Sequence, residues 1–219
     1  MISEAVMPIL LLLGALLAGP VWAERSYPPH EILTWQQRSF AGLTDYRLVA
    51  DQLPPRLHAR CDNSASALYL RQRIDLEQTP ILEWSWGVDQ VFAGTNERSK
   101  AGDDYPVRLY VVIDGGLRPW RTRAVNYVWS SHQPIGSHWP NAFTRQAMML
   151  ALRSGPASQP GELVSEQRNV REDFLALHGQ APRHIDGLAI MTDCDNSGQP
   201  TQGWYGTIRW RATSSSTPR

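Results

Sequence analysis

The stretch Ile81-Leu-Glu-Trp-Ser-Trp-Gly-Val88 decides the fold, because large apolar side chains occupy every second position in it. These side chains are Leu82, Trp84, Trp86 and Val88. Side chains at alternate positions of a β-strand lie on one face, so the four would form a continuous apolar surface. Such a surface needs a second layer to cover it, and the stretch therefore predicts a core strand of a packed sheet.

The same alternation recurs along the chain between clusters of Gly, Pro, Asn and Asp, which is typical of a β-sandwich or barrel. The strands that it predicts are residues 46–51, 56–61, 66–76, 81–88, 107–114, 123–130, 143–153, 163–168, 187–192 and 204–211. In 107–114, Val107, Leu109 and Val111 are expected to face the core, and Arg108 and Tyr110 to face outward.

One short helix is expected over residues 169–178. Asn169 can cap its first turn, and Glu172 follows three residues later as in a capping box. Apolar residues then recur at helical spacing up to Gly179, a residue that commonly ends helices. No internal repeat is visible, so we expect one β-sandwich domain over 24–213 and a loose C-terminal tail over 214–219.

The composition excludes several classes of protein. The 219 residues include 21 basic and 21 acidic side chains, and the pI is near 7.0. Nucleic acids and anionic membranes need a basic excess or stripe, so neither is expected as a partner. Hydrophobic residues make up 42% of the chain, which is enough to bury a core. The nine tryptophans suit either a dense β core or a sugar-stacking face.

Residues 1–23 are expected to be a secretory signal peptide. Their apolar stretch, 7–21, is too short for a membrane span, and Val21-Trp22-Ala23 has small residues where a signal peptidase cleaves. The residues before this stretch carry Glu4 and no Lys or Arg, which translation from Met7 instead of Met1 would explain. An uncleaved anchor is the alternative. We expect a periplasmic or secreted protein with no membrane span after cleavage.

The chain has two cysteines, Cys61 and Cys194. In an oxidising compartment they can form one disulfide, which would close a loop of about 130 residues and stabilise the fold by roughly 4–5 kcal/mol. Two buried free thiols are the alternative, because the sequence alone does not decide pairing.

The loop Thr192-Asp-Cys-Asp-Asn-Ser-Gly198 places oxygen-bearing side chains at alternate positions before a glycine, as the start of a calcium loop does. A calcium loop has a bidentate carboxylate at its twelfth position, which counted from Asp193 is Trp204. The match is therefore incomplete. Three interpretations stay open: an Asx-rich turn, a calcium site at Asp193 and Asp195, and a ligand-contact loop that includes Asn196.

A second polar loop, Lys100-Ala-Gly-Asp-Asp-Tyr-Pro106, leads into strand 107–114. Its Asp103 and Asp104 can act in acid–base catalysis, bind a cation or accept hydrogen bonds from sugar hydroxyls. Adjacent aspartates point in different directions, so a catalytic dyad of these two alone is not expected. A solvated turn is the alternative. Arg108 and Tyr205 are expected on outward strand faces that present Arg and Tyr side chains. Such faces can recognise a glycan by stacking and bidentate hydrogen bonds, or be ordinary solvated faces.

Seven blocks occur in the order in which they stand in a bacterial secreted family, the domain of unknown function 3047. The blocks are Cys61-Asp-Asn-Ser-Ala-Ser66, Leu82-Glu-Trp-Ser-Trp86, Lys100-Ala-Gly-Asp-Asp-Tyr-Pro-Val-Arg108, Asn126-Tyr-Val-Trp129, Arg153-Ser-Gly155, Glu166-Gln-Arg-Asn-Val-Arg-Glu-Asp173 and Ile190-Met-Thr-Asp-Cys-Asp-Asn196. The chain resembles this family from residue 40 to residue 211. The resemblance implies no activity, because none is established for the family.

The chain is also similar in general pattern to galactose-binding-like jelly-roll sandwiches, whose last strand the stretch Trp204-Tyr-Gly-Thr-Ile-Arg-Trp210 resembles. The fold expected from pattern and resemblance together is an all-β, antiparallel sandwich of jelly-roll type with one short helix.

The expected function is non-catalytic binding of a glycan or another cell-envelope ligand. The residues expected at the site are Asp103, Asp104, Arg108, Trp129, Asp193, Asp195, Asn196 and Tyr205. No residue is assigned as catalytic, because the motifs of nucleophilic and zinc hydrolases are missing from the sequence. Calcium is the one cofactor considered.

Two other functions stay open. A carboxylate-dependent enzyme acting on an envelope polysaccharide would need two carboxyl groups facing each other across a cleft, roughly 5–10 Å apart. A structural partner of another envelope protein would need a large exposed apolar patch.

Overall fold

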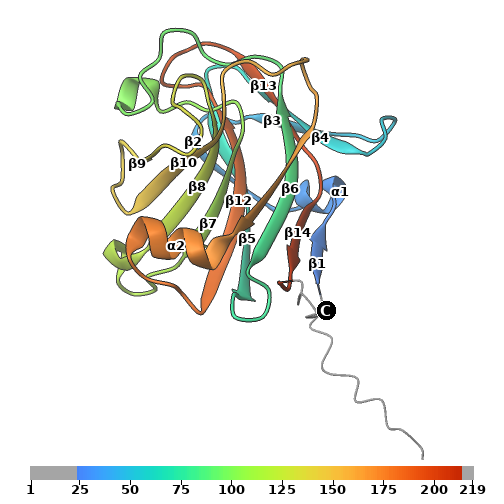
Figure 1. Cartoon of the computed structure of the whole chain (residues 1–219). Coiled ribbons are helices and arrows are strands. Elements are labelled where there is room, and N and C mark those ends of the chain that lie inside the picture. The colour runs from blue at the N-terminus through green and yellow to red at the C-terminus, as the bar shows by residue number, and fades with distance from the viewer. Residues whose placement is uncertain (1–23, 214–219) are drawn as a thin grey trace, which may run out of the picture.

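The computed structural model describes residues 24–213, in which two seven-stranded sheets pack face to face (Figure 1). The expected β-sandwich is therefore confirmed. The expected signal peptide, 1–23, and the expected tail, 214–219, lie outside the described residues. None of the helices within 24–213 has the length and apolar composition needed to cross a membrane.

Sheet I has the strand order β1-β14-β6-β13-β4-β3, and β11 also pairs with β6. Its strands are β1 (Arg25–Tyr27), β3 (Asp45–Val49), β4 (Arg56–Cys61), β6 (Ile81–Val88), β11 (Val164–Asn169), β13 (Thr201–Tyr205) and β14 (Ile208–Arg211). The central strand β6 pairs with β11, β13 and β14. Its Trp84 and Trp86 are buried and pack against aromatic rings of the other sheet, as their alternation predicts.

Sheet II has the strand order β2-β5-β12-β7-β8-β10-β9. Its strands are β2 (Gln36–Ala41), β5 (Ala65–Asp75), β7 (Arg108–Ile113), β8 (Arg123–Ser130), β9 (His138–Pro140), β10 (Ala147–Ser154) and β12 (His184–Asp193). The pair β8–β10 is parallel, whereas the other neighbouring pairs of this sheet are antiparallel. The sandwich is thus antiparallel apart from one strand pair.

The two faces of β7 show how the alternation separates core from surface. Leu109 and Val111 are fully buried between the sheets, together with Val107 just before the strand. Arg108 and Tyr110 project from the opposite, outer face of sheet II, as their position in the sequence predicts.

The expected helix is confirmed as α2 (Val170–His178). The Asn169 side chain accepts a hydrogen bond from the Glu172 backbone N–H at 3.3 Å, and Gly179 ends the helix with a left-handed φ of 72°. Buried Val170 and Phe174 attach the helix to the core. The sequence did not predict three further short pieces, α1 (Pro29–Ile32), η1 (Lys100–Gly102) and η2 (Pro119–Arg121).

The strand expected over 204–211 is in fact two strands, β13 and β14, which are separated at Gly206. A Cβ on Gly206 would lie 2.0 Å from Ser85 Oγ, and the Gly206 backbone N–H donates to Ser85 O at 2.8 Å. This close approach interrupts the strand and changes which residues on either side of Gly206 face the core. Tyr205 consequently faces the core, and the expectation that it faces outward is corrected. Strands β1, β2 and β9 were not expected either, and β10 begins four residues later than the expected 143–153.

Candidate functional site

The outer face of sheet II carries the candidate site. Directly paired residues of neighbouring strands project from the same side of a sheet. The register places Tyr69, Ala189, Tyr110 and Asn126 in one row across β5, β12, β7 and β8. The next row holds Ala67, Met191, Arg108 and Val128. The residues that alternate with these rows lie in the core, so both rows belong to the outer face.

This face is hollowed because small side chains line its centre, among them Ala65, Ala67 and Ala189. Two cavities result. The first, the Arg108 cavity, has a volume of about 400 Å³. The second, the Arg71 cavity, has a volume of about 330 Å³. Phe40 and Tyr110 line both cavities, so together they form one groove.

Arg108 occupies the floor of its cavity and is 4% exposed. Its guanidinium group forms an ion pair with Asp193, and Nη1 lies 3.9 Å from Asp103 Oδ2. The group also lies between two aromatic rings, 5.2 Å from the Tyr105 centroid and 5.3 Å from the Tyr110 centroid. A guanidinium does not deprotonate in proteins, so Arg108 is a fixed positive charge.

Several carboxyl groups share this one guanidinium. Burial raises the pKa of Asp103, and burial likewise raises the pKa of Asp193, while Arg108 opposes the rise at both. Asn141 Nδ2 donates to Asp103 Oδ2 at 2.7 Å, which also favours the ionised form. Burial and the neighbouring Asp104 raise the pKa of Asp195. The floor of the Arg108 cavity therefore has more acidic than basic groups.

The two polar loops predicted from the sequence meet in space. The Tyr105 backbone N–H donates to Asp193 Oδ1 at 3.3 Å. Asp104 is fully buried and accepts the backbone N–H groups of Asn196 at 3.2 Å and Ser197 at 2.6 Å. It therefore fixes the shape of the 192–198 loop and does not line the groove.

A disulfide anchors the same loop. Cys194 is bonded to Cys61 at the end of β4, which joins the loop after β12 in sheet II to an inner strand of sheet I. Both residues are buried beside Phe92.

The carboxylate oxygens of Asp104, Asp193 and Asp195 lie within 4.8 Å of one another. Most of these oxygens already have partners, because Asp104 accepts N–H donors and Asp193 pairs with Arg108. The positive charge of Arg108 also opposes a cation at this place. The calcium site expected at Asp193 and Asp195 stays a prediction.

Three polar atoms of the Arg108 cavity have no hydrogen-bond partner among the described residues: Asp103 Oδ1, Arg108 Nε and Asn126 Oδ1. The three residues are at most 4% exposed. Buried polar groups without partners are uncommon, and each costs about 1–3 kcal/mol. Each of the three atoms exposes less than 1 Å² of surface, so a ligand that donates and accepts hydrogen bonds can satisfy them only when neighbouring side chains of the cavity move aside.

Two exposed aromatic rings line the opening of the Arg108 cavity. Phe40 of β2 is 60% exposed and Phe143 is 57% exposed, and both line the Arg108 cavity. Exposed phenyl rings beside buried polar groups offer a ligand both apolar faces and hydrogen bonds.

Of the eight residues expected at the site, five line the Arg108 cavity: Asp103, Arg108, Asp193, Asp195 and Asn196. Asp104, Trp129 and Tyr205 do not, which corrects those three assignments. Trp129 occupies a core-facing position of β8 and is 4% exposed. Its Nε1–H donates to Gly155 O at 2.8 Å. The Tyr205 hydroxyl lies in the core, 2.9 Å from Thr192 Oγ1.

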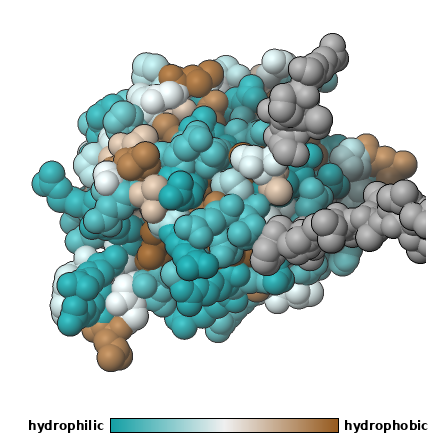
Figure 2. Space-filling model, turned by 60° about the horizontal axis from the view of Figure 1, so that its bottom comes forward, coloured by the Kyte–Doolittle hydropathy of each residue, from teal (hydrophilic) through white to brown (hydrophobic). Residues whose placement is uncertain are grey.

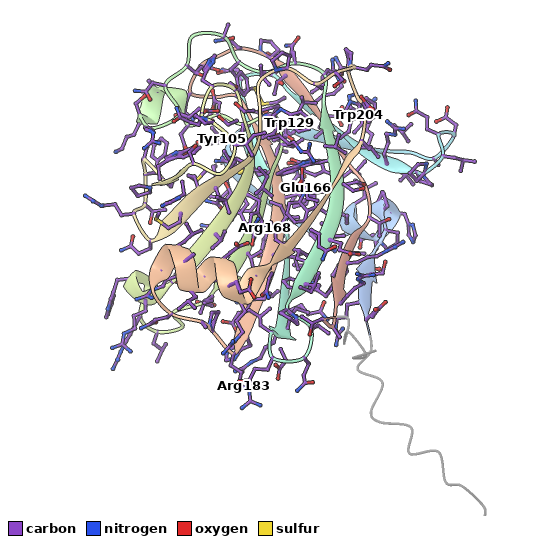
Figure 3. All side chains as sticks on the ribbon, viewed as in Figure 1. Tyr105, Trp129, Glu166, Arg168, Arg183 and Trp204 are labelled. Atoms are coloured by element: carbon purple, nitrogen blue, oxygen red, sulfur yellow. A yellow bond between two sulfur atoms is a disulfide. The ribbon has the colours of Figure 1, made fainter. Side chains whose placement is uncertain are left out.

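Trp139 and Trp204 also lie outside the groove. Trp139 is 2% exposed. Trp204 lies on sheet I and stacks on His58, with 4.0 Å between ring centroids. Figure 3 shows Tyr105, Trp129 and Trp204 toward one end of the sandwich and Arg183 at the other.

The residues of the Arg108 cavity that were missed from the sequence include Phe40, Asn126, Asn141 and Phe143. Asn126 could have been predicted as a site residue, because it is a polar residue at an outward-facing position of the apolar strand β8. Phe40 lies in a polar stretch, Gln36–Ala41, whose only large apolar residue faces the groove and not the core.

The fold and its groove define the class of protein: a β-sandwich of jelly-roll type with an open groove on the outer face of one sheet. The chain belongs to the family described as "Protein of unknown function (DUF3047)", whose model matches residues 33–209. The resemblance to this family is confirmed. No match was found among curated proteins.

Solved structures with a similar fold include carbohydrate-binding modules and a cellulase. The xylan-binding module CBM86 from Roseburia intestinalis is 12% identical, with 88% of this chain and 98% of that chain covered and a TM-score of 0.37. The family 11 carbohydrate-binding module of Lic26A-Cel5E from Clostridium thermocellum is 9% identical, with 87% and 95% covered and a TM-score of 0.46. A variant of the Cel12A cellulase of Rhodothermus marinus is 9% identical, with 85% and 100% covered and a TM-score of 0.43. At these identities the similarity concerns the fold.

Proposed function

We propose that this protein binds a glycan, without cleaving it, in the groove of sheet II. The observation that carries the proposal is the set of three unpartnered polar atoms in the floor of the Arg108 cavity. Asp103 Oδ1 and Asn126 Oδ1 accept hydrogen bonds, whereas Arg108 Nε donates one. Neighbouring hydroxyl groups of a sugar ring donate and accept at the same time, so a sugar offers hydrogen-bond partners of both kinds to these atoms.

The exposed rings of Phe40 and Phe143 support a sugar over other polar ligands. A pyranose ring has polar edges and apolar faces. Its hydroxyl edge fits the buried floor, and its C–H faces fit the phenyl rings at the mouth.

The position of the acids supports binding without cleavage. A glycosidase places two carboxyl groups on either side of the glycosidic bond, roughly 5–10 Å apart. Here Asp103 and Asp193 both lie beside the same guanidinium of Arg108, so they approach a ligand from one side. The alternative of an enzyme rests on the raised pKa of Asp103, which a general acid would need.

Binding is tested by screening the purified protein on an array of bacterial and plant glycans and titrating the bound glycans calorimetrically. Asn126→Ala is expected to weaken binding about tenfold or more, because it leaves a ligand hydroxyl without its acceptor. Gln167→Ala, which removes an exposed amide on β11, is the matched control and should bind as the unaltered protein does.

Two results would overturn this proposal. One is that no array glycan binds; the other is that Asn126→Ala, shown to be folded by its melting temperature, binds unchanged. Release of reducing ends from a bound glycan would instead support the enzyme.

We also propose that the chain is exported and that its signal peptide is removed before Glu24. The apolar stretch 7–21 and the Cys61–Cys194 disulfide support an oxidising compartment. Intact mass and N-terminal sequencing of protein from the native host should show Glu24 as the first residue. Ala23→Arg should block cleavage, because a signal peptidase needs a small residue there. A chain that still begins at Met1 or Met7 would contradict export by cleavage.

The third function considered, a structural partner of an envelope protein, finds no support on the face drawn in Figure 2. Hydrophobic side chains of the described residues lie there in small groups separated by hydrophilic ones. A protein-binding face would show a larger continuous apolar area.

A further inference from the structure

The Arg71 cavity continues the groove away from the Arg108 cavity and has a different lining. It is bounded by β2, β5, β7, the residue after β7, and β12; its charged and aromatic lining residues include Arg38, Tyr69, Arg71, Tyr110, Asp114 and Asp186. Tyr110 stands between the two cavities and lines both. A ligand that fills the groove would therefore pass over Tyr110.

The two basic side chains of this cavity have available charges. Arg38 and Arg71 are both exposed, and neither forms an ion pair with any residue in 24–213. The Arg38 guanidinium lies 5.1 Å from the centroid of the Phe40 ring, which holds it beside the groove.

The two acids of the same cavity are engaged with the backbone. Asp186 Oδ2 accepts the Asp114 N–H at 2.9 Å, and Asp114 Oδ1 accepts the Gly116 N–H at 2.9 Å. These contacts hold the turn after β7 but do not remove the charge of the carboxylates, so the lining of the Arg71 cavity has two acidic and two basic side chains.

The balance of acidic and basic side chains therefore differs along the groove. The Arg108 cavity holds Asp103, Asp193 and Asp195 against one arginine, so it disfavours an anionic ligand group. The Arg71 cavity offers two arginines, whose planar forks bind carboxylate or sulfate groups bidentately. From Arg108 to Asp114, the residue that follows β7, the chain extends roughly 20 Å, which is longer than a single sugar ring.

We infer that the groove binds an acidic oligosaccharide, with an anionic sugar over Arg38 and Arg71 and a neutral, hydroxyl-rich unit in the Arg108 cavity. This inference rests on the proposed glycan binding and adds the charge, the length and the orientation of the ligand. The anionic group is a carboxylate or a sulfate, since both match the arginine fork.

The test uses an array of uronate-containing, sulfated and neutral oligosaccharides of matched length, followed by calorimetric titration of the bound ones. We expect acidic oligosaccharides to bind, and their methyl-esterified or desulfated counterparts to bind about tenfold more weakly, because a charge-assisted hydrogen bond is lost. Raising the salt from about 0.05 M to about 0.5 M should weaken acidic ligands and leave neutral ones unchanged. The uronate and sulfate arms of the array identify which anion is bound.

Arg71→Gln should lower the affinity for the acidic oligosaccharide about tenfold. The matched control is Arg73→Gln on the same strand, an exposed arginine that does not line the cavity and contacts His184 instead; it should bind normally. Both side chains are exposed, so equal melting temperatures are expected.

The outcomes separate this inference from the proposed function. If neutral oligosaccharides bind through Asn126 with no preference for acidic ones, the inference fails and glycan binding stands. If Arg71→Gln and Arg73→Gln weaken acidic ligands equally, the anion does not lie in the Arg71 cavity and the inference also fails. If no oligosaccharide binds, both fail.

Discussion

Replacing both Cys61 and Cys194 with alanine is expected to lower the free energy of unfolding by about 4–5 kcal/mol. The disulfide joins residues separated by 133 positions, so it removes a large amount of conformational freedom from the unfolded chain. Urea denaturation of the oxidised protein and of the double variant measures the difference. Reduction of the unaltered protein is the control, because it opens the same bond without changing the sequence.

The same change should also weaken the groove. Cys194 lies between Asp193 and Asp195, and its bond to Cys61 ties the site loop to β4. Without the bond, the loop keeps its contacts to Asp104 but loses its covalent cross-link to β4. Amide hydrogen exchange at residues 193–198 should become faster in the double variant. A variant with an unchanged urea midpoint would show that this bond does not stabilise the folded state.

The alternation of apolar residues predicted the core strands because packing between two sheets selects for it directly. Strands β6, β7 and β8 and the capped helix α2 are found where the sequence placed them. Strand β2 was missed because its sequence, Gln36–Ala41, has no alternation of apolar and polar residues. Its outward residues line the groove and are therefore not selected for burial in the core.

The candidate site was predicted in part for a similar reason. Asp103 and Asp193 were identified because carboxylates concentrate in two loops, and these loops meet. Tyr205 was misplaced because a local contact, Gly206 against Ser85, shifts the alternation, and no propensity rule contains that contact. Phe143 and Asn141 lie in a loop, where only the fold determines which side chains reach the groove.

Replacing Arg108 with methionine is expected to destabilise the folded protein by about 3–5 kcal/mol at neutral pH, because it leaves buried carboxylates without their counter-charge. Asp103 and Asp193 are 4% and 1% exposed, so water cannot replace the guanidinium. Chemical denaturation measures the loss. Arg47→Met is the control: Arg47 also pairs with an aspartate, but its side chain is 68% exposed, and the change should be within about 0.5 kcal/mol.

The loss of folding stability caused by Arg108→Met should depend on pH, and the raised pKa values of the buried carboxyl groups set its direction. Burial raises the pKa of Asp103 and of Asp193, and removing Arg108 removes the group that opposed the rise. The folded variant then holds protons more tightly than the unfolded chain, whose aspartates have a pKa of about 3.9. Stability is therefore lost as the pH rises above about 4, and the variant should approach the unaltered protein in acid. A loss that does not change between acid and neutral pH would contradict this account.

The double variant Arg108→Met, Asp193→Asn tests why a buried ion pair is present on this face at all. It removes the guanidinium and its ion-pair partner together, so most of the lost stability should return. If the pair serves the ligand, the double variant should fold stably and still fail to bind glycans on the array, because Arg108 Nε no longer donates. Recovery of stability together with normal binding would show that the floor of the cavity does not contact the ligand through Arg108. Buried charges cost more desolvation than they return in stability when an apolar replacement fits, so a binding role is the physical reason to keep one here.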